Sequence, residues 1–309
     1  MVGLTGEQYE ITGGGYRAVV VECGAALRLL EHEGRPLLDG FGEDAMPTAG
    51  RGQVLMPWAN RIRDGAYSFA DRDLQLPLSE PKRHNASHGL VRWTAWTVEE
   101  HTTHTVSLTY RLMAQSGYPW TLDLHLLYDL SADGLTVTQS ATNLTPAPAP
   151  YAAGMHPYLT VGGPSAGTVD RLELRLPAAT RGMTDERKLP TAEEAVEGTA
   201  YDFRVSRPVR ETVLDHAFTD LVRDERGRAV AELRDPVDGS GVALWVDDAY
   251  RWLQVYSGDD ADDVARRSLA VEPMTAPADA FNSRRDLVTL SAAGAEGDEH
   301  SAAWGLGIL

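Results

Sequence analysis

Cysteine is nearly missing from the chain, which has Cys23 as its single thiol in 309 residues. A lone cysteine excludes a disulfide within the chain and suits a reducing compartment, so we expect a cytoplasmic protein. Basic residues are also scarce, with 28 lysines and arginines against 45 aspartates and glutamates and a net charge of −17. Because nucleic acids and anionic membranes are recognised by basic surfaces, we expect neither as a partner.

The sequence also has no long apolar segment and almost no helical pattern. No run approaches the ~20 apolar residues that span a bilayer, and residues 1–8 lack the basic-then-apolar order of a signal peptide. A helix is indicated only at residues 261–269, and it is short. The proline-rich residues 145–150 form a short, stiff connection rather than a linker. We therefore expect residues 1–309 to fold as a single domain.

What the sequence does contain is alternation with a period of two residues. Every even position from 120 to 130 is apolar, which is typical of a half-buried strand. The Asp133-Gly134 pair that follows accepts the positive φ of a tight turn and predicts an antiparallel hairpin. Many short strands with Gly and Pro between them predict an all-β fold, either a sandwich or a barrel. Similar alternation recurs at residues 106–112, 172–176 and 242–246, and further Asp-Gly pairs begin at Asp64 and Asp238.

Two prolines directly follow residues that suit acid–base chemistry. Glu272 ends the apolar run 269–271 and precedes Pro273, and His156 precedes Pro157. A residue before proline is biased toward extended geometry, so we expect each side chain at the end of a strand. A carboxylate and an imidazole on two stiff supports are what general acid–base catalysis needs. Either residue taken alone is more often structural, as a surface glutamate or a packed histidine.

Three further segments have the polar, aromatic-flanked character expected of a sugar-binding cleft. Asn60 and Arg61 follow Trp58 and offer fixed hydrogen-bond donors. His88 lies in a polar segment, and Asp215 lies in an otherwise apolar one. Taken singly, each has a plain structural interpretation, such as a surface ion pair for Arg61 or a cap for Asp215.

Taken together, these blocks resemble one family, the aldose 1-epimerases or galactose mutarotases. The resemblance implies a large antiparallel β-sandwich of the galactose mutarotase type that interconverts the α and β anomers of free hexoses such as glucose or galactose. It also implies Glu272 as the base and His156 as the acid. Leu159 and Met274 depart from residues that are common in the family. The matching blocks, in the family's order, are Asn60-Arg61-Ile62, Asn85 with His88-Gly89 and Arg92, His156-Pro157-Tyr158, Asp215 before Phe218, and Glu272-Pro273 with Pro277, Asp279, Ala280, Phe281 and Asn282. Of these, Asn60, Arg61, His88 and Asp215 match residues that bind or orient the sugar.

The chemistry of anomerisation accounts for these residue types. Ring opening removes a proton from the anomeric hydroxyl and delivers one to the ring oxygen, which a carboxylate and an imidazolium can do. Histidine suits this task because its ordinary pKa of ~6.5 keeps both protonation states accessible near neutrality. No metal or cofactor is needed, and the expected partner is a small sugar. The sequence leaves open whether the protein is a monomer or a homodimer.

Other functions remain compatible with parts of this pattern. A hexose-6-phosphate 1-epimerase would need a basic cluster for the phosphate, for which Lys82, Arg83 and Arg92 are candidates. A non-catalytic carbohydrate-binding sandwich would be expected to lack the acid or the base. A glycosidase could use Glu272 and Asp215 as its two carboxylates, but His156 would then have no task.

Overall fold

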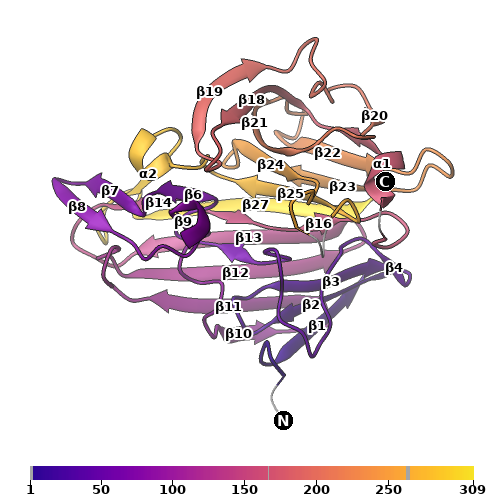
Figure 1. Ribbon diagram of the computed structural model, residues 1–309. Helices are drawn as coiled ribbons and strands as arrows, with labels where there is room; N and C mark the ends of the chain where they lie inside the picture. The colour runs from indigo at the N-terminus through magenta and orange to yellow at the C-terminus, as the bar shows by residue number, and fades with distance from the viewer. Residues whose placement is uncertain (1–2, 166, 262–264) are drawn as a thin grey trace.

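The computed structural model describes residues 3–165, 167–261 and 265–309, and strands dominate it (Figure 1). All strand pairs among these residues are antiparallel. A nine-stranded sheet and an eight-stranded sheet contain most of them. The prediction of a large antiparallel all-β fold is therefore confirmed. None of the described helices is long and apolar enough to cross a membrane.

The nine-stranded sheet contains the most regular alternation in the sequence. Leu122, Leu124 and Leu126 are buried, whereas the residues between them are partly exposed. The predicted hairpin at Asp133-Gly134 is present, with Ser131 paired to Gly134 across the turn. In sheet order the strands are β10 (Thr97–His101), β11 (Thr105–Leu112), β12 (Leu122–Ser131), β13 (Gly134–Asn143), β27 (Glu299–Ile308), β23 (Gly241–Val246), β22 (Ala229–Arg234), β17 (Glu173–Arg175) and β20 (Arg207–Pro208).

The eight-stranded sheet presents different chemistry on its two faces. Leu253, Val255 and Val271 belong to the buried apolar cluster, while Gln254 and Glu272 point the other way because side chains alternate along a strand. In sheet order the strands are β19 (Pro190–Ala195), β18 (Ala178–Thr184), β21 (Asp215–Leu221), β24 (Trp252–Tyr256), β25 (Leu269–Met274), β15 (Gly154–Met155) and β5 (Val54–Leu55), and β16 (Tyr158–Leu159) also pairs with β25.

Small sheets and short helical turns complete the described structure. Strands β6 (Arg61–Arg63) and β7 (Ala66–Phe69) and helix α2 (Ala280–Ser283) lie beside one another at one end of the large sheets (Figure 1). The four-stranded sheet consists of β1 (Gln8–Gly13), β2 (Tyr16–Val21), β3 (Leu27–His32) and β4 (Arg35–Pro36). The pairs are β6 (Arg61–Arg63) with β9 (Asn85–Ser87), β7 (Ala66–Phe69) with β8 (Arg72–Gln75), and β14 (Ala149–Tyr151) with β26 (Val288–Leu290). The helical turns are η1 (Pro81–Arg83), α1 (Thr168–Arg171) and α2 (Ala280–Ser283).

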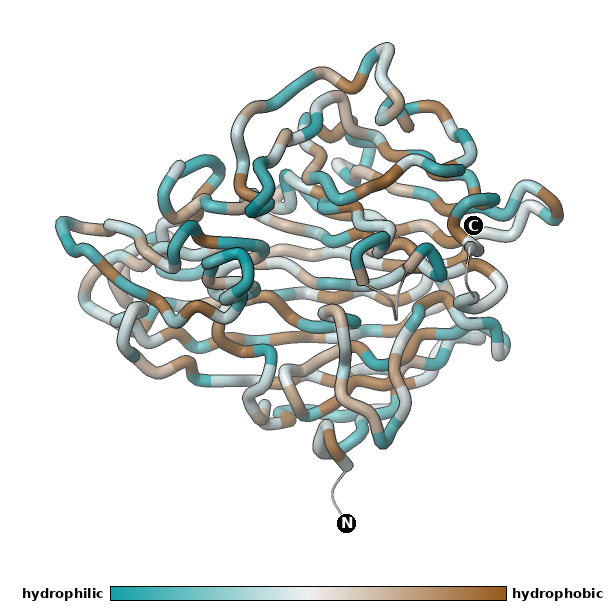
Figure 2. The backbone as a smooth tube through the Cα atoms, in the orientation of Figure 1, coloured by the Kyte–Doolittle hydropathy of each residue, from teal (hydrophilic) through white to brown (hydrophobic). Residues whose placement is uncertain are grey.

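One buried apolar cluster joins the two large sheets. Leu126 and Val137 contribute from the nine-stranded sheet, and Leu253 and Val271 contribute from the eight-stranded sheet. Apolar and polar segments alternate along the strands in Figure 2, as expected when one face of each strand is buried. The polar face of the eight-stranded sheet is thereby left free to carry a binding site.

Strand β25 does not end where the sequence predicted. It continues through Pro273 to Met274 instead of stopping at the proline. The backbone N–H groups of Val271 and Thr275 donate to carbonyls of residues 153–157 on the neighbouring segment. Proline has no N–H, and Pro273 lies in the gap between the ladder pairs Gly154–Met274 and Tyr158–Ala270, where the ladder is interrupted anyway. Glu272 is therefore held inside a strand rather than at its end.

The helix predicted at residues 261–269 is also wrong for the part that the structure describes. Residues 265–268 form turns, and Leu269 already begins β25. Arg266 has a φ of 50°, which is incompatible with a right-handed helix. Its guanidinium binds the carboxylates of Asp170 and Asp259. Residues 262–264, at the centre of the predicted helix, lie outside the described residues.

Candidate active site

A cavity of about 400 Å³ lies over the polar face of the eight-stranded sheet. Sheet pairing and the loops between strands bring segments that are far apart in the sequence to its walls. Gln254 on β24 is the cross-strand partner of Glu272 on β25, and both side chains line the cavity. The residues predicted for the site all line this cavity, namely Asn60, Arg61, His88, His156, Asp215 and Glu272.

Glu272 and His156 contact each other on the cavity wall. The distance between Glu272 Oε1 and His156 Nε2 is 3.3 Å. Glu272 comes from the middle of β25, and His156 from the break between β15 and β16. The two pre-proline residues therefore lie side by side, and a ligand that meets one of them also meets the other.

Burial sets the proton affinity of this pair. Glu272 is 2% exposed and His156 is 6% exposed. Burial raises the pKa of Glu272 well above its ordinary value, and Asp215 raises it further, whereas Arg61 lowers it. Burial lowers the pKa of His156 to about 3, and the positive charge of Arg92 acts in the same direction. The two groups therefore hold one proton between them over a wide pH range and titrate as a unit.

Several polar atoms at the pair are left without protein partners. Glu272 Oε2, His156 Nδ1 and His88 Nδ1 are buried and form no hydrogen bond with any described residue. The rings of His88 and His156 meet edge to face, with 5.7 Å between their centroids. Buried polar atoms in proteins are normally hydrogen-bonded, so these atoms indicate a site made for a polar ligand.

The position of His156 is fixed from several sides. Its backbone N–H donates to Gln53 O at 3.1 Å, and its carbonyl accepts from Gly52 N at 3.0 Å. Tyr158 stacks on the imidazole with 5.0 Å between ring centroids. Gly50 covers another side with a φ of 79°, and a Cβ there would lie 2.7 Å from the imidazole Cδ2. A side chain at position 50 would therefore displace the ring or the backbone.

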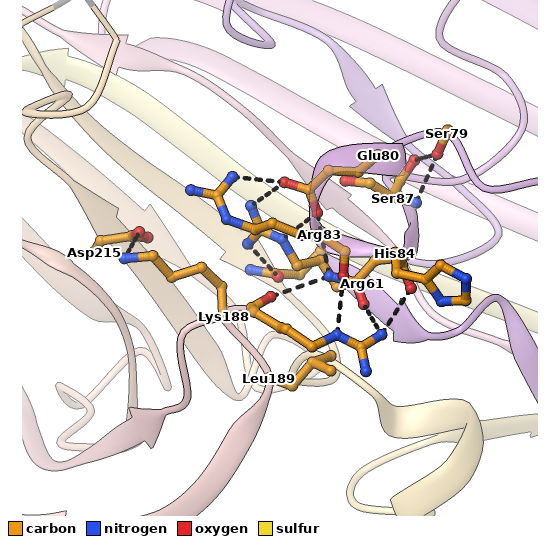
Figure 3. A network of polar contacts seen from close by, with 12 residues as sticks. Arg61, Ser79, Glu80, Arg83, His84, Ser87, Lys188, Leu189 and Asp215 are labelled. Carbon is orange, nitrogen blue, oxygen red and sulfur yellow. Dashed lines mark hydrogen bonds and ion pairs between the residues drawn. The ribbon is translucent and has the colours of Figure 1, made fainter.

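Arg61 is held by a carboxylate that sequence reasoning missed. Its Nε and Nη2 atoms donate to the two oxygens of Glu80 at 2.7 and 3.0 Å. Arg83 donates to the same carboxylate and to Asp260, and Figure 3 shows both guanidinium groups beside Glu80. Burial alone would raise the pKa of Glu80, but these arginines hold it below its ordinary value. The fork of Arg61 is therefore oriented before any ligand arrives.

Asp215 is held by two further residues that sequence reasoning missed. Lys188 Nζ lies 2.7 Å from Asp215 Oδ2, and Gln254 Nε2 donates to Asp215 Oδ1 at 2.9 Å (Figure 3 shows the Lys188 contact). Gln254 Oε1 accepts from Asn60 Nδ2 at 3.4 Å, and Asn60 Oδ1 accepts from Arg61 at 3.3 Å. A continuous chain of polar contacts therefore runs from Lys188 to Arg61 along one wall of the cavity.

Some of these missed residues carried a signal in the sequence. Glu80 precedes Pro81, in the same arrangement as Glu272 before Pro273. Lys188 offered no such signal, because it lies in a polar turn far from the other site residues. Among residues 3–165, 167–261 and 265–309 there is no group of three or more His, Cys, Asp or Glu residues that could hold a metal ion.

Comparison with known proteins assigns the chain to a family. The model of the aldose 1-epimerase family matches residues 7–300, so the chain belongs to the aldose 1-epimerase family. YihR of Escherichia coli K12, an uncharacterized protein, is 35% identical over 287 residues, which are 93% of this chain and 89% of YihR.

Solved structures show the same fold at lower identity. A GalM/aldose epimerase homologue from C. elegans is 20% identical with a TM-score of 0.85, and the match covers 98% of both chains. Galactose 1-epimerase from Lactobacillus acidophilus NCFM is 20% identical with a TM-score of 0.78, and the match covers 96% of this chain and 92% of that one. The predicted family and the predicted mutarotase-like β-sandwich are therefore confirmed.

Proposed function

We propose that this protein interconverts the α and β anomers of free aldohexoses such as glucose or galactose. The observation that carries the proposal is the buried contact of 3.3 Å between Glu272 Oε1 and His156 Nε2 on the cavity wall. Anomerisation moves protons at two oxygens that are bonded to the same carbon, the anomeric hydroxyl and the ring oxygen. An acid and a base that lie side by side suit this reaction.

The shifted pKa values favour the proton on Glu272, so ring opening with Glu272 as the base starts from the minor form, in which that proton has moved to His156 across the 3.3 Å contact. The carboxylate of Glu272 accepts the proton of the anomeric hydroxyl while His156 donates a proton to the ring oxygen. The bond between the anomeric carbon and the ring oxygen then breaks and leaves an open-chain aldehyde. After rotation about the neighbouring carbon–carbon bond, neutral His156 takes the proton of the attacking hydroxyl and Glu272 returns its proton to the new anomeric oxygen. No net proton is consumed, in agreement with a pair that holds one proton.

The remaining predicted residues suit a role in holding sugar hydroxyls. Arg61 is oriented by Glu80, and Asp215 is oriented by Lys188 and Gln254. Charge-assisted hydrogen bonds from fixed groups position a polar ligand well. The roles of Asn60, Arg61, His88 and Asp215 as sugar-binding residues are part of this proposal.

The charges of the cavity favour a free sugar over a sugar phosphate. Arg61 and Arg83 are both paired with Glu80, and Arg83 also contacts Asp260. Arg92 donates to Gln53 and to a backbone carbonyl. A phosphate would have to compete with these carboxylates for the guanidinium groups, at a loss of their existing charge-assisted hydrogen bonds.

Polarimetry of freshly dissolved α-D-glucose and α-D-galactose tests the proposal. The wild-type protein should accelerate the approach to the equilibrium rotation, and glucose 6-phosphate should be a poorer substrate than glucose. Glu272→Gln should reduce kcat by at least ~10²-fold, as loss of a general base does. Glu232→Gln is the matched control, because Glu232 lies on the nine-stranded sheet and pairs with Arg175. A Glu272→Gln protein with near-normal mutarotation, or an inactive wild type, would refute the proposal.

A further inference from the structure

Gln53 is a buried amide on the wall of the candidate active-site cavity, and none of the roles proposed above uses it. It is 1% exposed and comes directly before β5. Its backbone is held on both sides, since Gln53 N donates to Gly50 O at 3.0 Å and Gln53 O accepts from His156 N at 3.1 Å. The amide therefore reaches the cavity from a backbone segment that also holds the proposed acid.

The two polar atoms of this amide differ in their contacts. Oε1 accepts a hydrogen bond from Arg92 Nη1 at 3.2 Å, whereas Nε2 is buried and has no hydrogen-bond partner among the described residues. A guanidinium can only donate, so the oxygen of the amide and not its nitrogen faces Arg92. The orientation of the amide is thereby fixed. Because buried polar atoms in proteins are normally hydrogen-bonded, the unsatisfied N–H groups of Nε2 indicate an acceptor on a ligand.

The charge of Arg92 strengthens this donor. Arg92 donates to two neutral oxygens, Gln53 Oε1 and the backbone carbonyl of Ser87 at 3.4 Å, whereas Arg61 in the same cavity is paired with the carboxylate of Glu80. Burial lowers the pKa of Arg92, but a guanidinium keeps its proton at neutral pH. A cation that donates to Oε1 draws electron density from the amide and makes its N–H groups better donors.

A sugar hydroxyl is a suitable acceptor for such a donor. Its oxygen carries two lone pairs, and a hexose in the cavity presents several hydroxyls to the wall. Gln53 lines the same cavity as His156 and Glu272, so it faces the sugar on which the proposed reaction takes place. Sites built to hydrogen-bond a hydroxyl reject analogues that lack it, because a buried polar group is then left unpaired.

We propose that Gln53 donates a hydrogen bond from Nε2 to one hydroxyl group of the bound hexose, and that Arg92 orients and strengthens this donor. The inference rests on the proposed function and deepens it, since it adds a substrate-binding residue and a positioning residue to the same site. Gln53 thereby makes the protein selective for sugars that carry this hydroxyl. An amide that only held Arg92 in place would not distinguish one hydroxyl from another.

Gln53→Met tests the inference, because it removes the donor and keeps an unbranched side chain of similar size. Polarimetry gives kcat/KM for glucose and for 2-deoxyglucose, 3-deoxyglucose, 4-deoxyglucose and 6-deoxyglucose, each of which lacks one hydroxyl. The wild type and Arg92→Met are measured with the same sugars. Gln8→Met is the matched control, since Gln8 is a partly exposed amide on β1 that does not line the cavity.

We expect Gln53→Met to lower kcat/KM for glucose by about tenfold. With one of the four deoxy sugars, the wild type should already show this loss and Gln53→Met should lose little more, because donor and acceptor belong to one hydrogen bond. Arg92→Met should discriminate less against that same deoxy sugar. Gln8→Met should keep the wild-type values.

An equal loss with all the sugars in Gln53→Met overturns the inference and leaves the amide a structural role, as does a loss of less than twofold with glucose. Unchanged discrimination in Arg92→Met overturns the role of Arg92. Calorimetric titration with the same sugars separates the inference from the proposed function. A wild type that binds glucose without catalysing mutarotation refutes the proposed function, whereas the same selective pattern in the affinities supports Gln53 as the donor.

Discussion

The carboxylate of Glu272 is affected by two charged neighbours with opposite effects. Asp215 raises its pKa beyond the rise caused by burial, and Arg61 lowers it. Both neighbours are themselves held in place, Asp215 by Lys188 and Arg61 by Glu80. The proton affinity of Glu272, the proposed base, is therefore tuned by residues that we also propose to bind the sugar, which would link binding and chemistry through electrostatics.

Replacement of Asp215 should shift the pH dependence of catalysis in a known direction. The basic limb of the pH–rate profile arises when the Glu272–His156 pair loses its single proton. Because Asp215 raises the pKa of Glu272, Asp215→Asn should lower that pKa and move the basic limb of kcat to lower pH. Polarimetric rates measured across pH check this shift. Asp220→Asn, on the same strand but with its carboxylate on Thr180, is the control. A basic limb that stays in place or moves upward in Asp215→Asn would contradict the electrostatic account.

At the residue scale, sequence patterns marked residues that the fold gathers around one cavity, but not the groups that hold them in place. Pro273 and Pro157 marked Glu272 and His156 because proline restricts the residue before it. Glu80 and Lys188 form ion pairs with two of the predicted site residues, Arg61 and Asp215. Their partners are known only once the chain is folded, since Lys188 reaches Asp215 from another strand pair.

At the scale of elements, the hairpin β18–β19 connects two sides of the candidate active-site cavity. Strand β19 is an exposed edge strand, but the turn after β18 is firmly attached. Arg187 in that turn donates to the carbonyls of Arg83 and His84 and to the carboxylate of Asp64. The next residue, Lys188, has a φ of 61° and contacts Asp215. The turn therefore places the ammonium group of Lys188 beside Asp215, and Arg187 anchors the same turn to the segment around η1.

Loss of the Arg187 anchor should weaken sugar binding more than it slows chemistry. Arg187→Met removes the contacts to the η1 segment, and Lys188 then holds Asp215 in fewer of the molecules. We expect KM to rise about tenfold, equivalent to about 1.4 kcal/mol of binding, with little change in kcat. Steady-state polarimetry and hydrogen exchange of residues 185–189 check this.

Glu186→Gln is the control for this prediction, because Glu186 is an exposed residue of the same turn. It should leave both exchange and KM at wild-type values. If the turn exchanges faster in Arg187→Met while KM is unchanged, the hairpin has no part in binding.

Elements with strict alternation were predictable, and irregular ones were not. Residues 120–130 gave β12 and its turn because one face of the strand packs against the core. Strand β25 extends beyond Pro273 because the missing N–H falls in a gap between the ladder pairs Gly154–Met274 and Tyr158–Ala270. The helical prediction failed at residues 265–268, where ion pairs of Arg266 favour a turn. Such tertiary contacts leave no periodic trace in the sequence.

At the scale of the whole molecule, the candidate active site affects stability through its buried ionisable groups. The folded pair Glu272–His156 holds one proton at intermediate pH. The unfolded chain also holds one there, because an ordinary carboxyl with a pKa of ~4.3 has lost its proton while an ordinary imidazole with a pKa of ~6.5 has kept it. Between these two values the pair therefore contributes no net pH dependence to the free energy of unfolding. The raised pKa of Glu272 and the lowered pKa of His156 have opposite effects on the pH dependence of stability, and these effects cancel.

Single substitutions should reveal each of the cancelling effects. In the folded protein the pKa of His156 is about 3. As pH falls below ~6.5, His156 therefore takes up a proton in the unfolded chain but not in the folded protein, and stability is lost. The raised pKa of Glu272 acts in the opposite sense, since stability is lost as pH rises toward its folded pKa. Relative to wild type, Glu272→Gln should lose up to about 3 kcal/mol of stability between pH 6.5 and 4.5, and His156→Gln should gain stability over the same range.

Urea unfolding at pH 6.5 and 4.5 measures both changes, and only the differences between variants and wild type are compared, so that contributions from other groups cancel. His104→Gln, at an exposed position in the turn between β10 and β11, serves as the control. The two site variants should move in opposite directions from the wild type as the pH is lowered. Shifts of the same sign in both variants would show that the pair does not share one proton, and the acid–base assignment that depends on that shared proton would have to be abandoned.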